Sequence, residues 1–165
     1  MFTAEVDPHA SKSALYRDLE RSLASLLEGE SDPVANLANA AALLRQFLDR
    51  INWCGFYLLR RGELVLGPFQ GRPACVRIPI GSGVCGTAAE RRETLVVPDV
   101  NAFPGHIACD AASRSEIVVP LLPGGSLRGV LDVDAPELSR FDDEDRRGLE
   151  RFVKTLEPRV AWEAL

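Results

Sequence analysis

The first third of the chain carries apolar residues at helical spacing, which predicts two helices. The first helix is expected at residues 13–27, where five leucines fall on one face. The second opens with Asp32 followed by Pro33, a capping residue and a proline at the first helical position. Its apolar stripe continues to Ile51. Both stripes are expected to face a core, and the helical part is expected to span about residues 11–50.

From residue 52 onward, the pattern changes to short apolar runs separated by turn residues, which predicts strands. Six such runs occur, at residues 53–59, 64–69, 75–80, 95–97, 116–121 and 127–133. A short helix is expected at residues 84–92, and a closing helix at about residues 142–163 with a kink at Pro158. Residues 99–114 form a long polar stretch, and loops of that length without regular structure are often functional.

The order of these elements predicts an α+β fold. Hairpin-linked strands imply a mainly antiparallel sheet with helices packed on one face, which leaves the other face and its loops free to form a pocket. The chain has 165 residues, so we expect one domain over residues 1–165. The sheet and the loops of a candidate site are expected at about residues 52–134.

Composition and charge exclude several classes of function. The chain has 24 acidic and 19 basic side chains, a net charge of -5, which argues against nucleic acid and anionic membrane surfaces as partners. No apolar run approaches the ~18 residues of a membrane span, and residues 1–10 lack the features of a signal peptide. Four cysteines are too few for a secreted disulfide scaffold. The expected location is therefore a reducing cytoplasm.

The four cysteines all lie in the half of the chain with strands and loops. Cys54, Cys75, Cys85 and Cys109 include no C-x-x-C pair, so their spacing fits neither a zinc ribbon nor a thioredoxin-type motif. His106 lies three residues before Cys109 and could provide one edge of a metal site. Because the other candidate ligands are scattered, we expect no metal site.

Local context distinguishes these cysteines from one another. Cys54 lies inside an apolar run and is expected to be a small buried hydrophobic residue. Cys75 stands where a loop enters a strand. Cys85 lies near the start of a predicted helix, where free N–H groups stabilise a thiolate. Cys109 lies in the long loop beside Asp110, a polar neighbourhood, so a redox or nucleophilic role and an inert one both stay open.

A group of acids is expected on one face of the sheet. Asp132 and Asp134 are two residues apart on a strand, so both point the same way, and like charges that close raise one pKa. Glu116 opens the preceding strand, and the hairpin could bring it to the same patch. The alternative is a solvent-facing sheet edge. Trp53 and Tyr57 also share a strand face, for which core packing is the usual explanation.

Seven segments of the chain resemble one family. They are NWCGFYL at 52–58, GPFQGRPAC at 67–75, GVCGTA at 83–88, VPDV at 97–100, PGHIACD at 104–110, SEIVVP at 115–120 and GVLDVD at 129–134. In this order they resemble the free methionine-(R)-sulfoxide reductases, single-domain enzymes with the GAF fold. The resemblance is dense over residues 52–142 and extends to the flanking helices by layout only. Cys54 departs from it, because a small apolar residue is expected there.

The resemblance implies the substrate and the roles of the residues. Free methionine-(R)-sulfoxide would be reduced by the nucleophile Cys109, with Cys75 as the resolving cysteine and Cys85 as a further exchangeable thiol. Acids near the sulfoxide oxygen and aromatics lining a methyl-group pocket complete the expected substrate site: Trp53, Tyr57, Asp110, Glu116, Asp132 and Asp134.

The resemblance also implies a reaction that needs no bound cofactor or metal. Cys109 would become a sulfenic acid and then a disulfide with Cys75, which thioredoxin would reduce with electrons from NADPH through thioredoxin reductase. The flanking helices are consistent with a homodimer. The alternative from another class is a non-catalytic GAF-type sensor of a small molecule or of redox state. Against it, three clustered acids would repel a phosphate-bearing effector.

Overall fold

The computed structural model describes residues 3–107 and 109–165, and its centre is one six-stranded sheet. The order of the strands is β3-β2-β1-β6-β5-β4, and every neighbouring pair is antiparallel. This confirms the predicted mainly antiparallel sheet. The strands are β1 (Trp53–Arg60), β2 (Glu63–Gln70), β3 (Arg77–Pro79), β4 (Leu95–Val97), β5 (Ser115–Leu121) and β6 (Gly129–Ala135).

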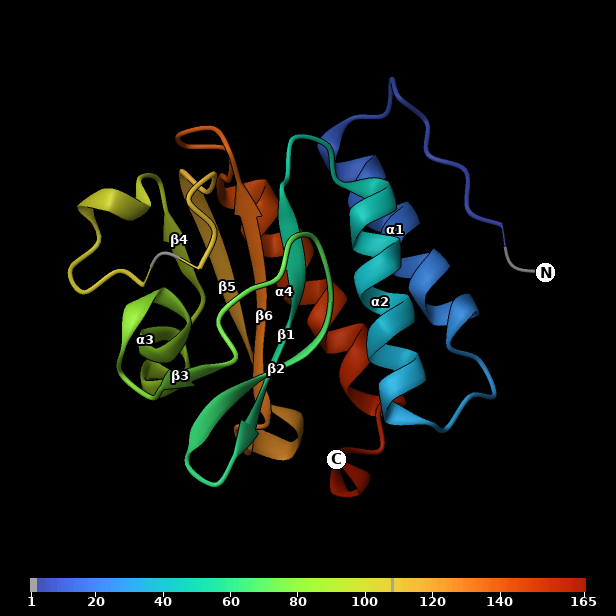
Figure 1. The fold of residues 1–165 in the computed structure, drawn as a ribbon. Coiled ribbons are helices and arrows are strands. Elements are labelled where there is room, and N and C mark those ends of the chain that lie inside the picture. The colour runs from blue at the N-terminus through green and yellow to red at the C-terminus, as the bar shows by residue number, and fades with distance from the viewer. Residues whose placement is uncertain (1–2, 108) are drawn as a thin grey trace.

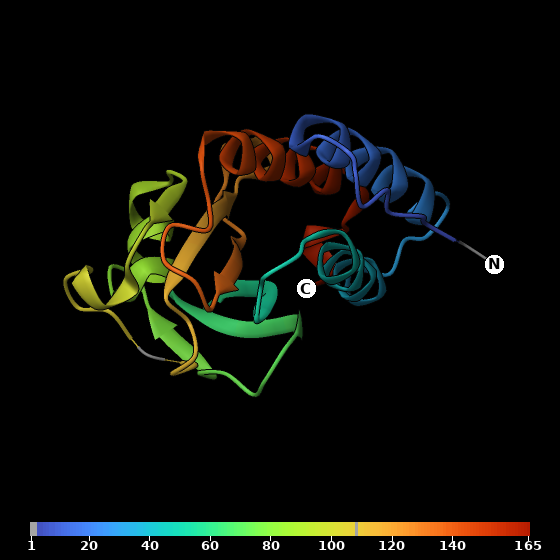
Figure 2. The same cartoon turned by 90° about the horizontal axis from the view of Figure 1, so that it is seen from above.

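Three long helices cover one face of the sheet, and one short helix covers the other (Figures 1 and 2). The long helices are α1 (Lys12–Leu26), α2 (Pro33–Phe47) and α4 (Asp143–Leu156), which form one apolar core with the sheet. The short helix α3 (Gly83–Arg91) packs its buried residues into a second core on the opposite face. The prediction that helices lie on one face therefore holds for the long helices and is wrong for α3.

Side-chain caps form at the start of the first two helices, and the cap at Asp32 was predicted. The Ser11 side chain accepts a hydrogen bond from the Ala14 N–H at α1, and Asp32 accepts one from the Ala35 N–H at α2. Each bond satisfies a backbone donor that has no partner within the helix. Pro33 occupies the first turn of α2, as predicted. Both helices are therefore fixed by local sequence as well as by their apolar faces.

The end of the chain differs from the prediction of one helix over residues 142–163. Helix α4 ends at Leu156, and short 3-10 turns follow at Glu157–Arg159 and Trp162–Ala164. Pro158 explains the end of α4, because a proline has no N–H to donate and its ring clashes with the carbonyl four residues earlier. The proline thus terminates the helix rather than kinking it.

The register of the central strands brings the candidate residues together. Trp53 is paired with Asp134, and Asp134 is paired with Glu116 on its other side. Paired residues lie on the same face of a sheet, here the face that α3 covers. Within the described residues 3–107 and 109–165, no helix has both the length and the apolar character needed to cross a membrane.

Candidate active site

A small cavity lies between the sheet, the start of α3 and the loop that joins β4 to β5. Its volume is about 30 Å³, room for roughly one or two water molecules. Seven of the nine candidate residues line it, and Cys75 adjoins it through its bond to Cys109. Trp53 packs beside Tyr57 and is not part of the lining. The candidates in the lining are Tyr57, Cys85, Cys109, Asp110, Glu116, Asp132 and Asp134.

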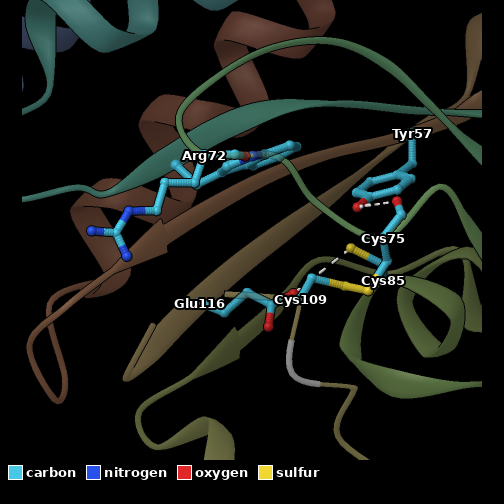
Figure 3. The surroundings of a disulfide bond; sticks show 7 residues. Tyr57, Arg72, Cys75, Cys85, Cys109 and Glu116 are labelled. Atoms are coloured by element: carbon cyan, nitrogen blue, oxygen red, sulfur yellow. Dashed lines mark hydrogen bonds between the residues drawn. A yellow bond between two sulfur atoms is a disulfide. The ribbon is translucent and has the colours of Figure 1, made fainter. Parts of the chain in front are cut away.

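A disulfide joins Cys75 to Cys109 at one wall of this cavity (Figure 3). The two Cα atoms are 5.2 Å apart, although 34 positions separate the residues along the chain. The bond connects the segment between β2 and β3 to the loop between β4 and β5. The third strand is shorter than predicted, since the segment with Cys75 leaves the sheet to reach Cys109. The two cysteines with implied nucleophilic and resolving roles are therefore the bonded pair.

The three acids form a cluster on the cavity wall, in which Glu116 and Asp132 are buried and Asp134 is half-buried. Glu116 is 5% exposed and Asp132 is 6% exposed, which excludes the alternative that they lie on a solvent-facing edge. Burial, followed by the nearby carboxyl groups, raises the pKa of Glu116 and of Asp134 well above the ordinary range. Burial raises the pKa of Asp132 to about 7. The cluster can therefore hold protons near neutral pH.

One oxygen of this cluster lacks a partner. Among the described residues, Asp132 Oδ1 is buried and accepts or donates no hydrogen bond. A buried polar atom without a partner is costly, and Asp132 lines the cavity. This oxygen is therefore available to a polar group of a ligand that enters the cavity.

Cys85 lies against the acids rather than in an environment that favours a thiolate. Its thiol is hydrogen-bonded to Glu116, with Sγ donating to Oε1 at 3.7 Å (Figure 3). Burial, followed by the charges of Asp132 and Glu116, raises the pKa of Cys85 well above its usual value. The prediction that the helix start would stabilise a Cys85 thiolate is wrong, because burial and the acids outweigh the N–H groups.

Cys54 occupies the opposite core, as predicted for a small hydrophobic residue. It is fully buried, its sulfur faces the Ala41 carbonyl oxygen at 3.5 Å, and burial raises its pKa to about 12. A thiol with that pKa is almost never ionised near neutral pH. Cys54 is therefore inert packing on the far side of the sheet from the cavity.

Three residues of the cluster could hold a metal ion by distance alone. Ligand atoms of Cys85, Glu116 and Asp132 lie within 4.8 Å of one another. The spacing of the cysteines along the sequence did not indicate this grouping, because strands and α3 bring the three residues together. A metal would have to displace their protons, and Cys85 already donates to Glu116. Cys85, Glu116 and Asp132 all have raised pKa values, which favours the protonated form of each group over metal binding.

The long loop is tied to the start of β1 by residues that the sequence reasoning missed. Asn52 Nδ2 donates to Asp110 Oδ2 at 3.1 Å and to Ser113 Oγ at 3.0 Å. The Ala112 N–H donates to Asp110 Oδ1, and this bond lowers the pKa of Asp110. Asp110 is therefore a fixed anion beside Cys109. Asn52 opens the NWCGFYL segment, and its polar side chain ahead of an apolar run was the signal available.

Further residues of the lining were not among the expected substrate-site residues. Ile107 packs against Gly83, where an added Cβ would lie 3.3 Å from Ile107 Cγ1. Gly83 has a positive φ of 60°, which favours glycine at the start of α3. His106 also lines the cavity, and partial burial lowers its pKa. The loop thus closes directly onto the first turn of α3.

Comparison with known proteins places the chain in a family. The GAF domain family matches residues 32–159. The chain is 53% identical over 151 residues to "Free methionine-R-sulfoxide reductase" of Escherichia coli (strain K12), covering 92% of each protein. A structure of free methionine-R-sulfoxide reductase from Neisseria meningitidis in complex with its substrate is 48% identical, with a TM-score of 0.93, over 99% of this chain and 97% of that one.

A second solved structure agrees with this assignment. The reduced form of fRMsr of Staphylococcus aureus is 58% identical with a TM-score of 0.85, over 87% of this chain and 94% of that one. Both the sequence match and the structural matches extend over most of the chain. The chain belongs to the GAF-domain family of free methionine-R-sulfoxide reductases.

Proposed function

We propose that the protein reduces free L-methionine-(R)-sulfoxide to L-methionine, with Cys109 as the nucleophile. The observation that carries this proposal is the position of Cys109, which lines the same cavity as Glu116, Asp132 and Asp134 and is bonded to Cys75. A thiol that attacks sulfur, a proton source and a second thiol are the groups that sulfoxide reduction needs. The names of the relatives support the substrate.

The first step transfers oxygen from the substrate to the enzyme. The Cys109 sulfur bonds to the sulfoxide sulfur, and the sulfoxide oxygen takes up a proton. The oxygen then transfers to the Cys109 sulfur as the transient sulfur–sulfur bond and the sulfur–oxygen bond of the substrate break, which leaves Cys109 as a sulfenic acid. Methionine leaves with two more electrons than the sulfoxide had. The departing oxygen needs a proton, and Asp132, with its unpartnered Oδ1 and a pKa of about 7, is placed to give one.

The second step forms the observed disulfide. The Cys75 sulfur displaces the oxygen of the Cys109 sulfenic acid, which leaves as water, so the two thiols have supplied both electrons. An external dithiol then reduces the disulfide. We propose thioredoxin for this role, supplied by NADPH through thioredoxin reductase. The reaction closes without a resident metal, flavin or nicotinamide, because the cysteines carry the electrons.

The small cavity supports an order for these events. With the disulfide closed, about 30 Å³ is open, which holds roughly one or two water molecules and not an amino acid. The substrate therefore binds after the disulfide has been reduced and the loop has opened. We propose that the loop closes again over the bound substrate. This closure would favour the free amino acid over methionine sulfoxide within a peptide, because a peptide chain would have to leave through the closed wall.

Coupled turnover on separated epimers tests the proposal. NADPH oxidation with thioredoxin and thioredoxin reductase should proceed with the free R epimer and not with the S epimer. In a single turnover without reductant, two thiols should be lost for each methionine released. Comparable kcat/KM for both epimers, or for an N-acetylated amide analogue, would refute the proposed substrate. A chain that binds the sulfoxide without losing thiols would instead be a sensor.

The cellular setting is proposed from the same chemistry. A thiol cycle with a free Cys85 beside the disulfide suits a reducing cytoplasm, where dithiol reductants are available. We propose a cytoplasmic enzyme that works as a homodimer. Fractionation and size-exclusion chromatography with light scattering test the two statements separately.

A further inference from the structure

Two aromatic side chains hold the segment that carries Cys75. Residues 72–75 lie between β2 and β3, outside the sheet. Trp53 Nε1 donates to the carbonyl oxygen of Arg72 at 3.1 Å. The Tyr57 hydroxyl donates to the carbonyl oxygen of Cys75 at 3.0 Å (Figure 3). The two bonds therefore hold both ends of a four-residue segment whose last residue bears a thiol of the disulfide.

Both donors are rigidly placed. Trp53 and Tyr57 are 2% and 1% exposed and project from β1, which is hydrogen-bonded on both edges, to β2 and β6. Their rings stack with centroids 5.9 Å apart, and Trp53 also stacks on Phe69 of β2 at 5.3 Å. Side chains packed in this way cannot turn to follow a moving loop. The segment is therefore fixed to a central strand of the sheet.

The path of the chain before the segment is fitted to the indole ring. Gly71 has a φ of 142°, and a Cβ at this position would lie 2.5 Å from Trp53 Cδ1. Only glycine combines that backbone conformation with so close an approach. The turn that leads from β2 into residues 72–75 is thus built against Trp53.

We propose that Trp53 and Tyr57 are positioning residues for Cys75, because their N–H and O–H groups hold residues 72–75 where the Cys75 thiol meets oxidised Cys109. The inference rests on the proposed function for its kinetic consequence. In that step a bond forms between the two sulfurs, the bond between Cys109 sulfur and oxygen breaks, and the oxygen leaves as water with the Cys75 proton. The hydroxyl of Tyr57 takes part in none of these bonds.

A thiol–disulfide equilibrium tests the inference independently of any substrate. The full-length protein is equilibrated in mixtures of reduced and oxidised glutathione, and the fraction with the Cys75–Cys109 bond is measured. Tyr57→Phe keeps the ring and removes only the hydroxyl, and we expect the equilibrium constant for disulfide formation to fall about fivefold, the effect of one hydrogen bond. Trp53→Phe, which removes the donor to Arg72, should lower it too.

Tyr16→Phe is the matched control. Tyr16 is also buried, and its hydroxyl donates to Asp145 Oδ1 at 2.8 Å in the other core, where α1 meets α4. This variant loses a buried tyrosine hydroxyl with its hydrogen bond and should leave the glutathione equilibrium constant unchanged. Thermal unfolding of both variants shows whether a general loss of stability accounts for the result. A similar fall of the equilibrium constant in the control would overturn the inference.

A kinetic measurement separates the inference from the proposed function. Reduced protein is mixed with methionine-(R)-sulfoxide without reductant, and methionine and disulfide are followed together with dimedone-trapped sulfenic acid. In Tyr57→Phe, the rate of disulfide formation relative to methionine release should fall about fivefold. A wild-type ratio together with a wild-type glutathione equilibrium would overturn the positioning role. Absence of methionine from wild-type protein would refute the proposed function, and the glutathione equilibrium would still decide the inference.

Discussion

Replacing Asp132 by Asn should change how the stability of the protein depends on pH. Burial raises the pKa of Asp132 from 3.8 to about 7. The folded state therefore keeps a proton that the unfolded state has lost, which favours folding at low pH. That stabilisation is fully present below pH 3.8 and is lost as the pH rises to about 7. At ~1.4 kcal/mol per pKa unit, the shift of about three units corresponds to about 4 kcal/mol.

The Asn variant cannot ionise at this position, so its unfolding free energy should fall less steeply with pH. The expected difference in slope is about 1.4 kcal/mol per pH unit between pH 4 and pH 7. Urea unfolding of the oxidised protein at intervals of pH measures it. Glu28→Gln removes an exposed carboxylate that follows α1 and is not part of the cavity lining. The unfolding free energy of this variant should change with pH in the same way as that of the wild type. Parallel curves for Asp132→Asn as well would refute a raised pKa at Asp132.

The remaining predictions assign a step to each thiol. Cys109→Ser should release no methionine even in a single turnover, because a hydroxyl group does not attack the sulfoxide sulfur; a full burst would show that another residue is the nucleophile. Cys75→Ser should release one methionine per chain and stop as a sulfenic acid trappable by dimedone; no burst in a folded variant would reverse the two roles. Cys85→Ser should form the disulfide at near the wild-type rate, since Cys85 lies outside the bonded pair; mass spectrometry of peptides would reveal any other pairing. Cys54→Ser should match the wild type in the burst, and a lower melting temperature is its expected effect, because the substitution puts a hydroxyl into the core.

The elements of the fold were predicted correctly where local patterns decide them. The cap at Asp32 and the alternation along β6 act within a few residues, so they can be read directly from the sequence. The shared face of Asp132 and Asp134 follows from the same alternation. The pairing of these two residues with β1 and β5 depends on the register of the strands. The hairpin signals in the sequence suggested that β5 and β6 are neighbours but did not give the register.

Features that depend on distant residues could not be predicted from local patterns. The face on which α3 packs depends on how the chain crosses the sheet. The environment of Cys85 depends on β5 and β6, which begin 30 and 44 residues after it. A buried ion pair between Arg140 and Asp145, which Tyr16 and Lys12 extend into α1, also went unrecognised. Charged residues in a polar stretch are normally read as surface, and only the packing of α1 on α4 encloses them.

In the proposed mechanism, the acid cluster and Cys109 can share one cavity because burial favours the protonated form of the acids. A cluster of three carboxylates would raise the pKa of a nearby thiol and suppress the nucleophile. Burial instead raises the pKa of Glu116 and Asp134 well above the ordinary range, and that of Asp132 to about 7. A carboxyl group in its protonated form does not repel a nearby thiolate and can still donate a proton. The desolvation that makes the cluster costly for folding therefore also makes it compatible with thiol chemistry. The same three acids in an exposed cluster would be ionised near neutral pH, so they would repel a thiolate and would have no proton to donate.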